Sequence, residues 1–136
     1  MPKLFLVTVF ARDIQASCNF YQKLFNFPLV PELSTPIFRA VNCGNLTLGF
    51  HADEAYDVLD LRDRQRGDSR AVDLLITFDA DSKEDVDAKV TAVTALGGSV
   101  VKPPFITYYN HYQAVLADID NTVFRVSYPL PVSVND

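Results

Sequence analysis

The chain has 136 residues, of which 49% are hydrophobic and 12% aromatic, a composition typical of one folded globular domain. Its net charge of −5 and pI near 4.8 argue against a nucleic-acid partner, because phosphate binding requires a basic face. No apolar run approaches the roughly 18 residues of a membrane-spanning helix, and no membrane partner is expected. Cys18 and Cys43 lack metal-ligand spacing and are too few for a disulfide framework. We therefore expect two buried, reduced thiols in a cytoplasmic protein.

The first half of the chain predicts a strand, a helix and then further strands. An apolar run begins at Leu4, and Asp13 can accept hydrogen bonds from the first turn of a helix near residues 13–26. Apolar side chains then recur on one helical face, at Ile14, Cys18, Tyr21 and Phe25. Pro28 should return the chain to a short strand ending at Val30. Two more strands are predicted, at Ile37–Asn42 and Leu46–Phe50.

The second half repeats this order. Ser82 and Asp85 predict the start of a helix near residues 82–96, and Gly97 favours its end. The predicted strands are Asp73–Phe78, Ser99–Val101, Gln113–Ala117 and Val123–Ser127, and the turn before the last one contains Asn121, which tolerates a positive φ. A repeat of about 70 residues is too long for a solenoid unit.

The repeat predicts an α+β fold made of two βαβββ modules, about residues 3–52 and 71–130, in a single domain spanning 1–136. Two such modules would form a curved mixed sheet around a cavity. The segment between them, about residues 53–70, is rich in Asp and Arg and is typical of a solvated linker. Tyr56, Leu59 and Leu61 could form one short helical turn there. The alternative to a solvated linker is a mobile cover over the cavity.

Three segments resemble the vicinal oxygen chelate superfamily, which has the glyoxalase / bleomycin resistance / dioxygenase fold. They are Val9–Ile14, Asn19–Phe27 (with Asn26 where the family usually has Gly) and Ala114–Val126. Together they follow the family's order over nearly the whole chain. The resemblance implies a duplicated module with its functional site in the cavity.

The resemblance also implies where a metal would bind, because the family's metal enzymes place His or Gln on the first strand of a module and Glu on the last. The first-strand positions here are expected to be Leu6 and Asp73. The last-strand positions are expected to be Arg125 and either Thr47 or Gly49. Leucine has no donor atom and arginine keeps a positive charge. One carboxylate does not make a site, so we expect no metal and no other cofactor.

Two histidines could still be recruited as ligands. His51 ends one predicted strand and His111 precedes another, positions typical of a cavity rim. Either could equally be an ordinary polar side chain.

Strand alternation predicts the lining of the cavity. If Val7 and Val9 face the helix, their neighbours on the first strand face the cavity, and Tyr109 and Tyr112 would lie near its mouth. These tyrosines could stack on a planar ligand or pack in a dimer interface. The predicted ligand-binding residues are Leu6, Thr8, Phe10, Asp73, Thr77, Tyr109, Tyr112 and Arg125; no catalytic residue is identified.

Asp73 and Arg125 are the most notable pair in this set. They could form an ion pair that only joins two strands. Alternatively, Arg125 could present its guanidinium to an anionic ligand while Asp73 orients it.

The predicted function is a metal-free protein that binds a small molecule and works by sequestration, assembled as a homodimer. One alternative is a metal-dependent lyase, isomerase or dioxygenase of the same fold, with ligands such as Asp73, His51 and His111. Another is a non-catalytic interaction module with a vestigial cavity.

Overall fold

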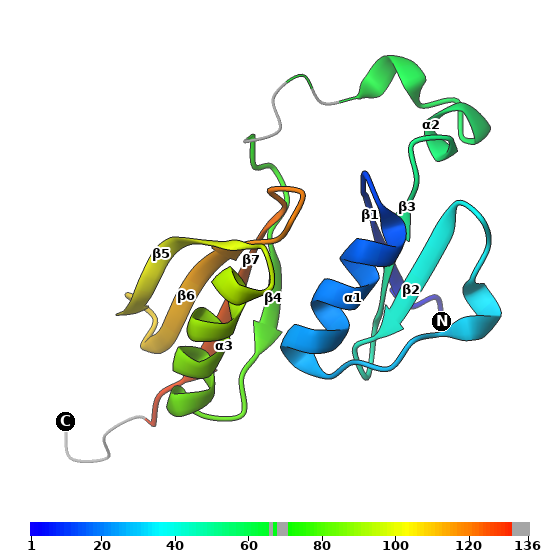
Figure 1. Ribbon diagram of the computed structural model, residues 1–136. Helices are drawn as coiled ribbons and strands as arrows, with labels where there is room; N and C mark the ends of the chain where they lie inside the picture. The colour runs from blue at the N-terminus through cyan, green and yellow to red at the C-terminus, as the bar shows by residue number, and fades with distance from the viewer. Residues whose placement is uncertain (66, 68–70, 132–136) are drawn as a thin grey trace. The chain divides into compact units, whose positions relative to one another are not determined.

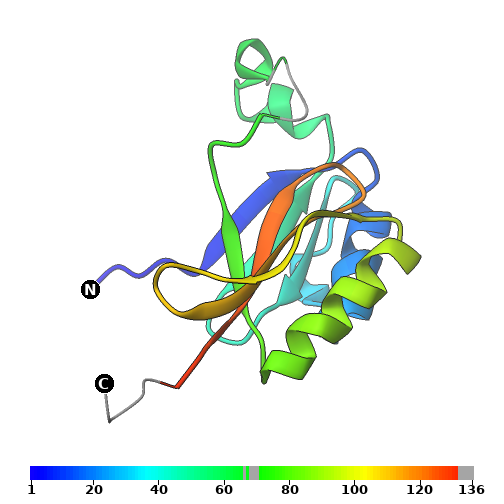
Figure 2. The same ribbon diagram turned by 90° about the vertical axis from the view of Figure 1, so that its left-hand side faces the viewer.

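The computed structural model describes residues 1–65, 67 and 71–131 (Figure 1). The chain forms two compact units, Met1–Ser69 and Arg70–Asp136. Each unit contains one sheet and one long helix, and in each the helix lies against one face of the sheet (Figure 2). The predicted α+β fold with a duplicated module is confirmed, and its strands belong to two separate sheets. None of the helices in these ranges is long and apolar enough to cross a membrane.

The sheet of the first unit has three strands in the order β1-β3-β2. They are β1 (Leu6–Phe10), β2 (Phe38–Asn42) and β3 (Thr47–His51). β3 pairs in parallel with β1 and antiparallel with β2. Helix α1 (Ile14–Phe25) has the predicted bounds: the Asp13 carboxylate accepts hydrogen bonds from two backbone amides of the first turn, and Asn26 ends the helix with φ of 64°.

The core of the first unit lies between α1 and its sheet. The ring of Tyr21 stacks on that of Phe50 with centroids 5.5 Å apart, and both side chains are buried. The short strand predicted to end at Val30 is reduced to one bridge between Leu29 and Val41. The prediction of a strand was wrong because Pro31 already begins a 3₁₀ helix, for which its fixed φ is suited.

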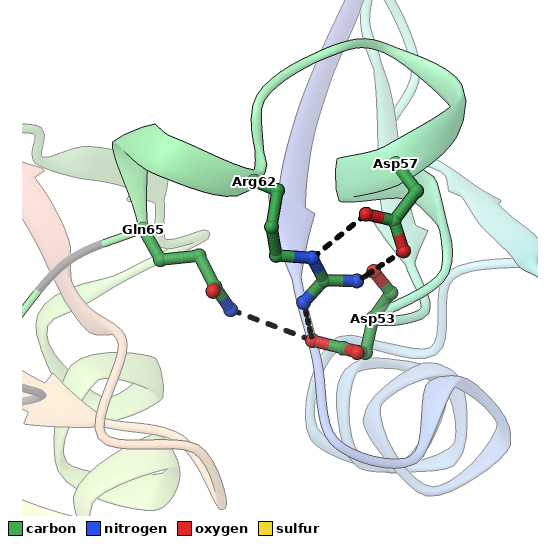
Figure 3. Close-up of polar contacts among 4 residues, drawn as sticks. All are labelled: Asp53, Asp57, Arg62 and Gln65. Atoms are coloured by element: carbon green, nitrogen blue, oxygen red, sulfur yellow. Dashed lines mark hydrogen bonds and ion pairs between the residues drawn. The ribbon is translucent and has the colours of Figure 1, made fainter.

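The segment after β3 forms helix α2 (Ala55–Val58) and a 3₁₀ helix at Arg62–Arg64. Of the residues predicted for a helical turn, Tyr56 lies in α2, whereas Leu59 follows its end and Leu61 precedes the 3₁₀ helix. The guanidinium of Arg62 joins two carboxylates of the segment, Asp53 at 3.0 Å and Asp57 at 2.7 Å (Figure 3). This bonding lowers the pKa of Asp57. Described residues of the predicted linker thus have folded structure of their own.

The sheet of the second unit has four strands in the order β4-β7-β6-β5. They are β4 (Ile76–Asp79), β5 (Ser99–Ile106), β6 (His111–Ala117) and β7 (Val123–Pro129). β4 starts three residues later than predicted. Its partner β7 begins at Val123, so residues before Leu75 would lie opposite the preceding turn, where no strand is available.

The edge strand β5 extends beyond the predicted Val101 to Ile106 and contains Pro103 and Pro104. Prolines are tolerated there because an edge strand has one unpaired side, and two irregularities interrupt its register. In the turn before β7, Asp118 accepts two backbone hydrogen bonds and Asn121 has φ of 62°, as predicted.

Helix α3 (Lys83–Ala95) begins with the predicted capping arrangement. The Ser82 hydroxyl accepts a hydrogen bond from the backbone amide of Asp85, and the Asp85 carboxylate accepts one from the backbone amide of Asp81, each at 3.0 Å. The same carboxylate binds Lys89 at 2.7 Å. The bond to Lys89, followed by the one to Asp81, lowers the pKa of Asp85.

The cysteines differ in burial. Cys18 is buried as predicted, whereas Cys43 is only partly buried, so the second part of that prediction was wrong. Desolvation nevertheless raises the pKa of Cys43 to about 11. Both are free thiols, and a thiol with such a pKa is poorly reactive at neutral pH.

We predict that Asp85→Asn lowers the free energy of unfolding by about 1 kcal/mol at neutral pH, because it weakens a helix cap and an ion pair. A carboxylate whose pKa is lower in the folded state stabilises the protein above its unfolded pKa and loses that effect as pH falls through the folded pKa. The difference between wild type and variant should therefore narrow below about pH 4. Urea unfolding across this pH range measures it.

Glu84→Gln is the matched control, since Glu84 lies in the same first turn of α3 and should cost less than about 0.5 kcal/mol. The prediction fails if the two variants are equally stable, or if the deficit of Asp85→Asn is unchanged at low pH.

Candidate functional site

The strand register decides which side chains of the first unit face away from α1. Val9 is paired with Phe50, and Phe50 stacks on Tyr21 of α1. Because neighbouring residues on a strand alternate, Thr8 and Phe10 lie on the opposite side, which we call the helix-distal face. The predicted parity of β1 is therefore confirmed, and it places Leu6 on the same face.

The helix-distal face of the first unit is aromatic. The ring centroid of His51 lies 5.6 Å from that of Phe10 and 4.9 Å from that of Phe38. Tyr56 stacks on Phe10 at 3.8 Å with an interplanar angle of 14°. We call Phe10, Phe38, His51 and Tyr56 the aromatic cluster. Its rings offer flat, apolar contact surface of the kind that binds small molecules.

Gly49 gives the ring of Phe38 its place in this cluster. A Cβ atom at Gly49 would lie 2.5 Å from the Phe38 ring and 3.0 Å from the Thr8 hydroxyl. Any larger residue must therefore displace the ring that packs beside His51.

We predict that Gly49→Ala destabilises the protein by about 1–3 kcal/mol through overpacking. Adding Phe38→Leu should recover part of the lost free energy of unfolding, because the smaller side chain removes the ring that a Cβ at position 49 would clash with. Urea unfolding of the two single variants and the double variant measures this coupling. Gly67→Ala is the control, since nothing lies within 4 Å of a Cβ there; strictly additive single effects would contradict the prediction.

The second unit presents a polar helix-distal face instead. Phe124 and Val126 of β7 are fully buried, and Phe124 packs edge-on against Phe78, so Arg125 between them points to the other side. Arg125 is paired in register with Thr77. Its Nε donates a hydrogen bond to the Thr77 hydroxyl at 2.9 Å.

Two further hydrogen bonds cross the same face. The imidazole Nδ1 of His111 lies 2.9 Å from the hydroxyl oxygen of Ser127, and the Tyr109 hydroxyl donates to the Gln113 side chain at 2.7 Å. The rings of Tyr109 and His111 meet edge to face at 4.8 Å. Gln113 and Ser127 are buried, so one partner in each of these two hydrogen bonds is held in place by the surrounding protein. We call these six residues of the helix-distal face the polar row: Thr77, Arg125, Ser127, His111, Gln113 and Tyr109.

Tyr112 does not join the polar row. It follows His111 on β6 and points to the helix side, where its hydroxyl donates to the carboxylate of Asp87 in α3 at 2.6 Å. This carboxylate raises the pKa of Tyr112. The structure thus places the two tyrosines of the predicted site on opposite faces of the sheet.

The registers also settle which residues correspond between the two units. Phe10 lies three residues before the cap of α1, and Asp79 lies three residues before the cap of α3. Counting back from these positions, Thr8 corresponds to Thr77, and their register partners Gly49 and Arg125 correspond to each other. Gly49, and not Thr47, is therefore the last-strand position of the first unit.

By the same count, Leu6 corresponds to Leu75. Asp73, which was predicted for this position, lies two residues earlier; it is exposed and precedes β4, which begins at Ile76. The Arg125 side chain donates its hydrogen bond to the hydroxyl of Thr77.

The residues that the resemblance and these registers assign to the family's metal-ligand positions do not fit a metal. They are Leu6, Leu75, Gly49 and Arg125, and none offers a side-chain donor that can hold a cation. In residues 1–65, 67 and 71–131, no group of three or more His, Cys, Asp and Glu side chains could hold a metal ion. The metal-binding histidine alternatives lie in separate units, His51 in the aromatic cluster and His111 in the polar row.

Sequence reasoning missed several residues of these faces. Ser127 was not predicted as a partner of His111, since their contact depends on the register of β6 with β7. Tyr56 was predicted only as part of a helical turn, because stacking on Phe10 is a long-range contact. The lone tyrosine in a charged segment was the available signal.

Comparisons with known proteins agree with this fold. The model of the Glyoxalase/Bleomycin resistance protein/Dioxygenase superfamily matches residues 3–126. A glyoxalase/bleomycin resistance protein/dioxygenase family enzyme from Burkholderia phytofirmans PsJN is 39% identical, with a TM-score of 0.90, over 95% of this chain and 100% of that one.

More distant structures share the fold. A glyoxalase-related enzyme from Fulvimarina pelagi has 16% identity and a TM-score of 0.77, over 98% of this chain and 94% of that one. A lactoylglutathione lyase from Agrobacterium tumefaciens has 21% identity and a TM-score of 0.66, over 93% and 92%. The search of curated proteins found no match. From its two modules and from these matches, the chain belongs to the glyoxalase/bleomycin resistance protein/dioxygenase superfamily.

Proposed function

We propose that this protein is a cytoplasmic homodimer that binds a small molecule without a metal and works by sequestration. The proposal is carried by the residues that the resemblance and the strand registers together assign to the family's ligand positions: Leu6, Leu75, Gly49 and Arg125. Three have no donor side chain and the fourth is a cation. A dication beside a guanidinium would be repelled by several kcal/mol even at an effective dielectric near 20.

The side chain of Arg125 indicates that the ligand carries an anionic group. Its Nε is occupied by Thr77, which fixes the plane of the guanidinium. The two terminal nitrogens have no hydrogen-bond partner within residues 1–65, 67 and 71–131. They can form the paired hydrogen bonds that a carboxylate accepts. His111, held through Nδ1 by Ser127, offers Nε2 as a second polar contact.

The expected ligand of this face is therefore a small organic anion, whose charge Arg125 would contact. The Burkholderia relative carries the description of an enzyme, so an enzyme using a metal held by Asp73, His51 or His111 is the competing outcome of the test.

The first measurement is elemental analysis with native mass spectrometry of protein purified without chelator. We expect far less than one zinc, nickel, iron or manganese per chain, and a dimer mass. Arg125→Glu should still bind no metal, because Leu6 and Leu75 contribute no donor. Stoichiometric metal in the unmodified protein would overturn the proposal in favour of the enzyme.

The second measurement is a thermal-shift titration with benzoate as the probe. Wild type should be stabilised, and Arg125→Gln should bind benzoate about tenfold to a hundredfold more weakly, since a hydrogen bond to a charged group is lost. Arg125→Lys is the control: it keeps the charge but not the planar fork, and should be intermediate. Equal shifts in all three proteins would contradict anion binding at Arg125, and a captured protein partner without any ligand response would favour the interaction module.

A further inference from the structure

Strand β5 has a long free edge. It is the last strand in the order β4-β7-β6-β5 (Figure 1), and with eight residues it is the longest strand in the described part of the chain. The free edge of a sheet presents backbone N–H and C=O groups that can pair with a strand of another molecule. An edge of this length is therefore a place where chains could associate.

The side chains of β5 make such association more favourable. Val101 is 57% exposed and Ile106 is 60% exposed, and Val100 beside them is also exposed. Pairing this edge with another strand would remove part of that apolar surface from water. Both the backbone and the side chains of β5 thus favour contact with another chain.

The other sheet edges are short or covered by the chain itself. β1 and β4 have five and four residues, and short edge strands are poor templates for pairing. Along the outer edge of β2, the backbone amide of Val30 donates to the carbonyl of Ala40 at 3.0 Å, and the amide of Asn42 donates to the carbonyl of Pro28 at 2.8 Å. β5 is twice as long as β4, so its edge needs protection of another kind.

Three consecutive residues interrupt the edge of β5. Pro103 and Pro104 have no backbone N–H, so neither can donate a hydrogen bond to an added strand. Lys102 before them is exposed, and its ammonium group lies 3.8 Å from the centre of the Phe105 ring. Pairing of two such edges would bring like charges together, which opposes the contact.

The backbone of β5 is also irregular at these residues. From Val100 to Lys102, β5 advances by two residues while β6 advances by one, and from Lys102 to Phe105 it advances by three while β6 advances by two. Each step leaves one extra residue in β5, as in a β-bulge, which bends and twists a strand. A bent edge is a poorer template for a second strand than a straight one.

We propose that Lys102, Pro103 and Pro104 block the outer edge of β5, so that it does not pair with a strand of another copy of this chain. The block combines missing donors, a charge and a bent backbone on the one long edge strand that carries exposed apolar side chains. It goes beyond the proposed function, because none of the three residues belongs to the aromatic cluster or to the polar row.

The test is the mass of the assembly, measured by sedimentation velocity on the full chain from roughly 10 µM to roughly 1 mM. Wild type should form no species larger than a dimer. Pro103→Thr combined with Pro104→Val restores two backbone N–H groups through residues that favour strands, and should form larger species whose share rises with concentration. Adding Lys102→Thr should increase that share. Hydrogen exchange of the β5 amides should be slower in these species than in wild type.

A control and a rescue variant separate edge pairing from misfolding. Pro36→Thr, in the turn before β2, makes the same kind of change away from β5 and should keep the wild-type mass. Val101→Lys, added to the double proline variant, places a charge on the restored edge and should return it to the wild-type mass. A surface lysine would not correct a misfolded core.

Circular dichroism and urea unfolding establish that each variant is folded. If the double variant does not fold, Pro103→Thr and Pro104→Val are measured singly, since each restores one N–H group. The proposal is wrong if the folded variants keep the wild-type mass at every concentration, or if wild type itself assembles beyond a dimer. It is equally wrong if the larger species form without slower exchange in β5.

Discussion

The parallel pairing of the first strand of each unit with the last is the constraint on which both helix-distal faces depend. In the first unit it places Thr8 beside Gly49, and in the second it places Thr77 beside Arg125. Because side chains alternate along both strands, this register decides at once which residues pack under the helix and which remain available for a ligand. A shift by one residue would exchange the two sets.

One pair of equivalent positions then gives the two units different chemistry. Gly49 has no side chain, so the Phe38 ring moves over it and closes an aromatic surface around His51. Arg125 at the equivalent position holds a charge beside Thr77 and leaves the surrounding face polar. The duplication therefore does not produce two copies of one site. It produces an aromatic surface in one unit and a polar surface that carries a guanidinium in the other.

The sequence predicts what local physics determines. Asp13 and Ser82 as helix caps, Asn121 in its turn and the parity of β1 follow from neighbours a few residues away. The start of β4 was missed because a strand ends where its partner ends, and the partner β7 lies more than forty residues further along the chain. The stacking of Tyr56 on Phe10 and the bond between His111 and Ser127 are likewise set by tertiary contacts, which local patterns do not encode.

Arg125 also reverses the charge at its position. The resemblance implies a carboxylate there in the family's metal enzymes, and this chain has a guanidinium instead. A last-strand carboxylate attracts a cation, and a cation then attracts the oxygen atoms of a substrate. A guanidinium can attract such oxygens directly, with the orientation supplied by Thr77. An anionic group can thus be bound without a metal, because the positive charge of a guanidinium belongs to the chain itself. A guanidinium does not supply the Lewis acidity of a metal, so the role that we propose for Arg125 is one of binding.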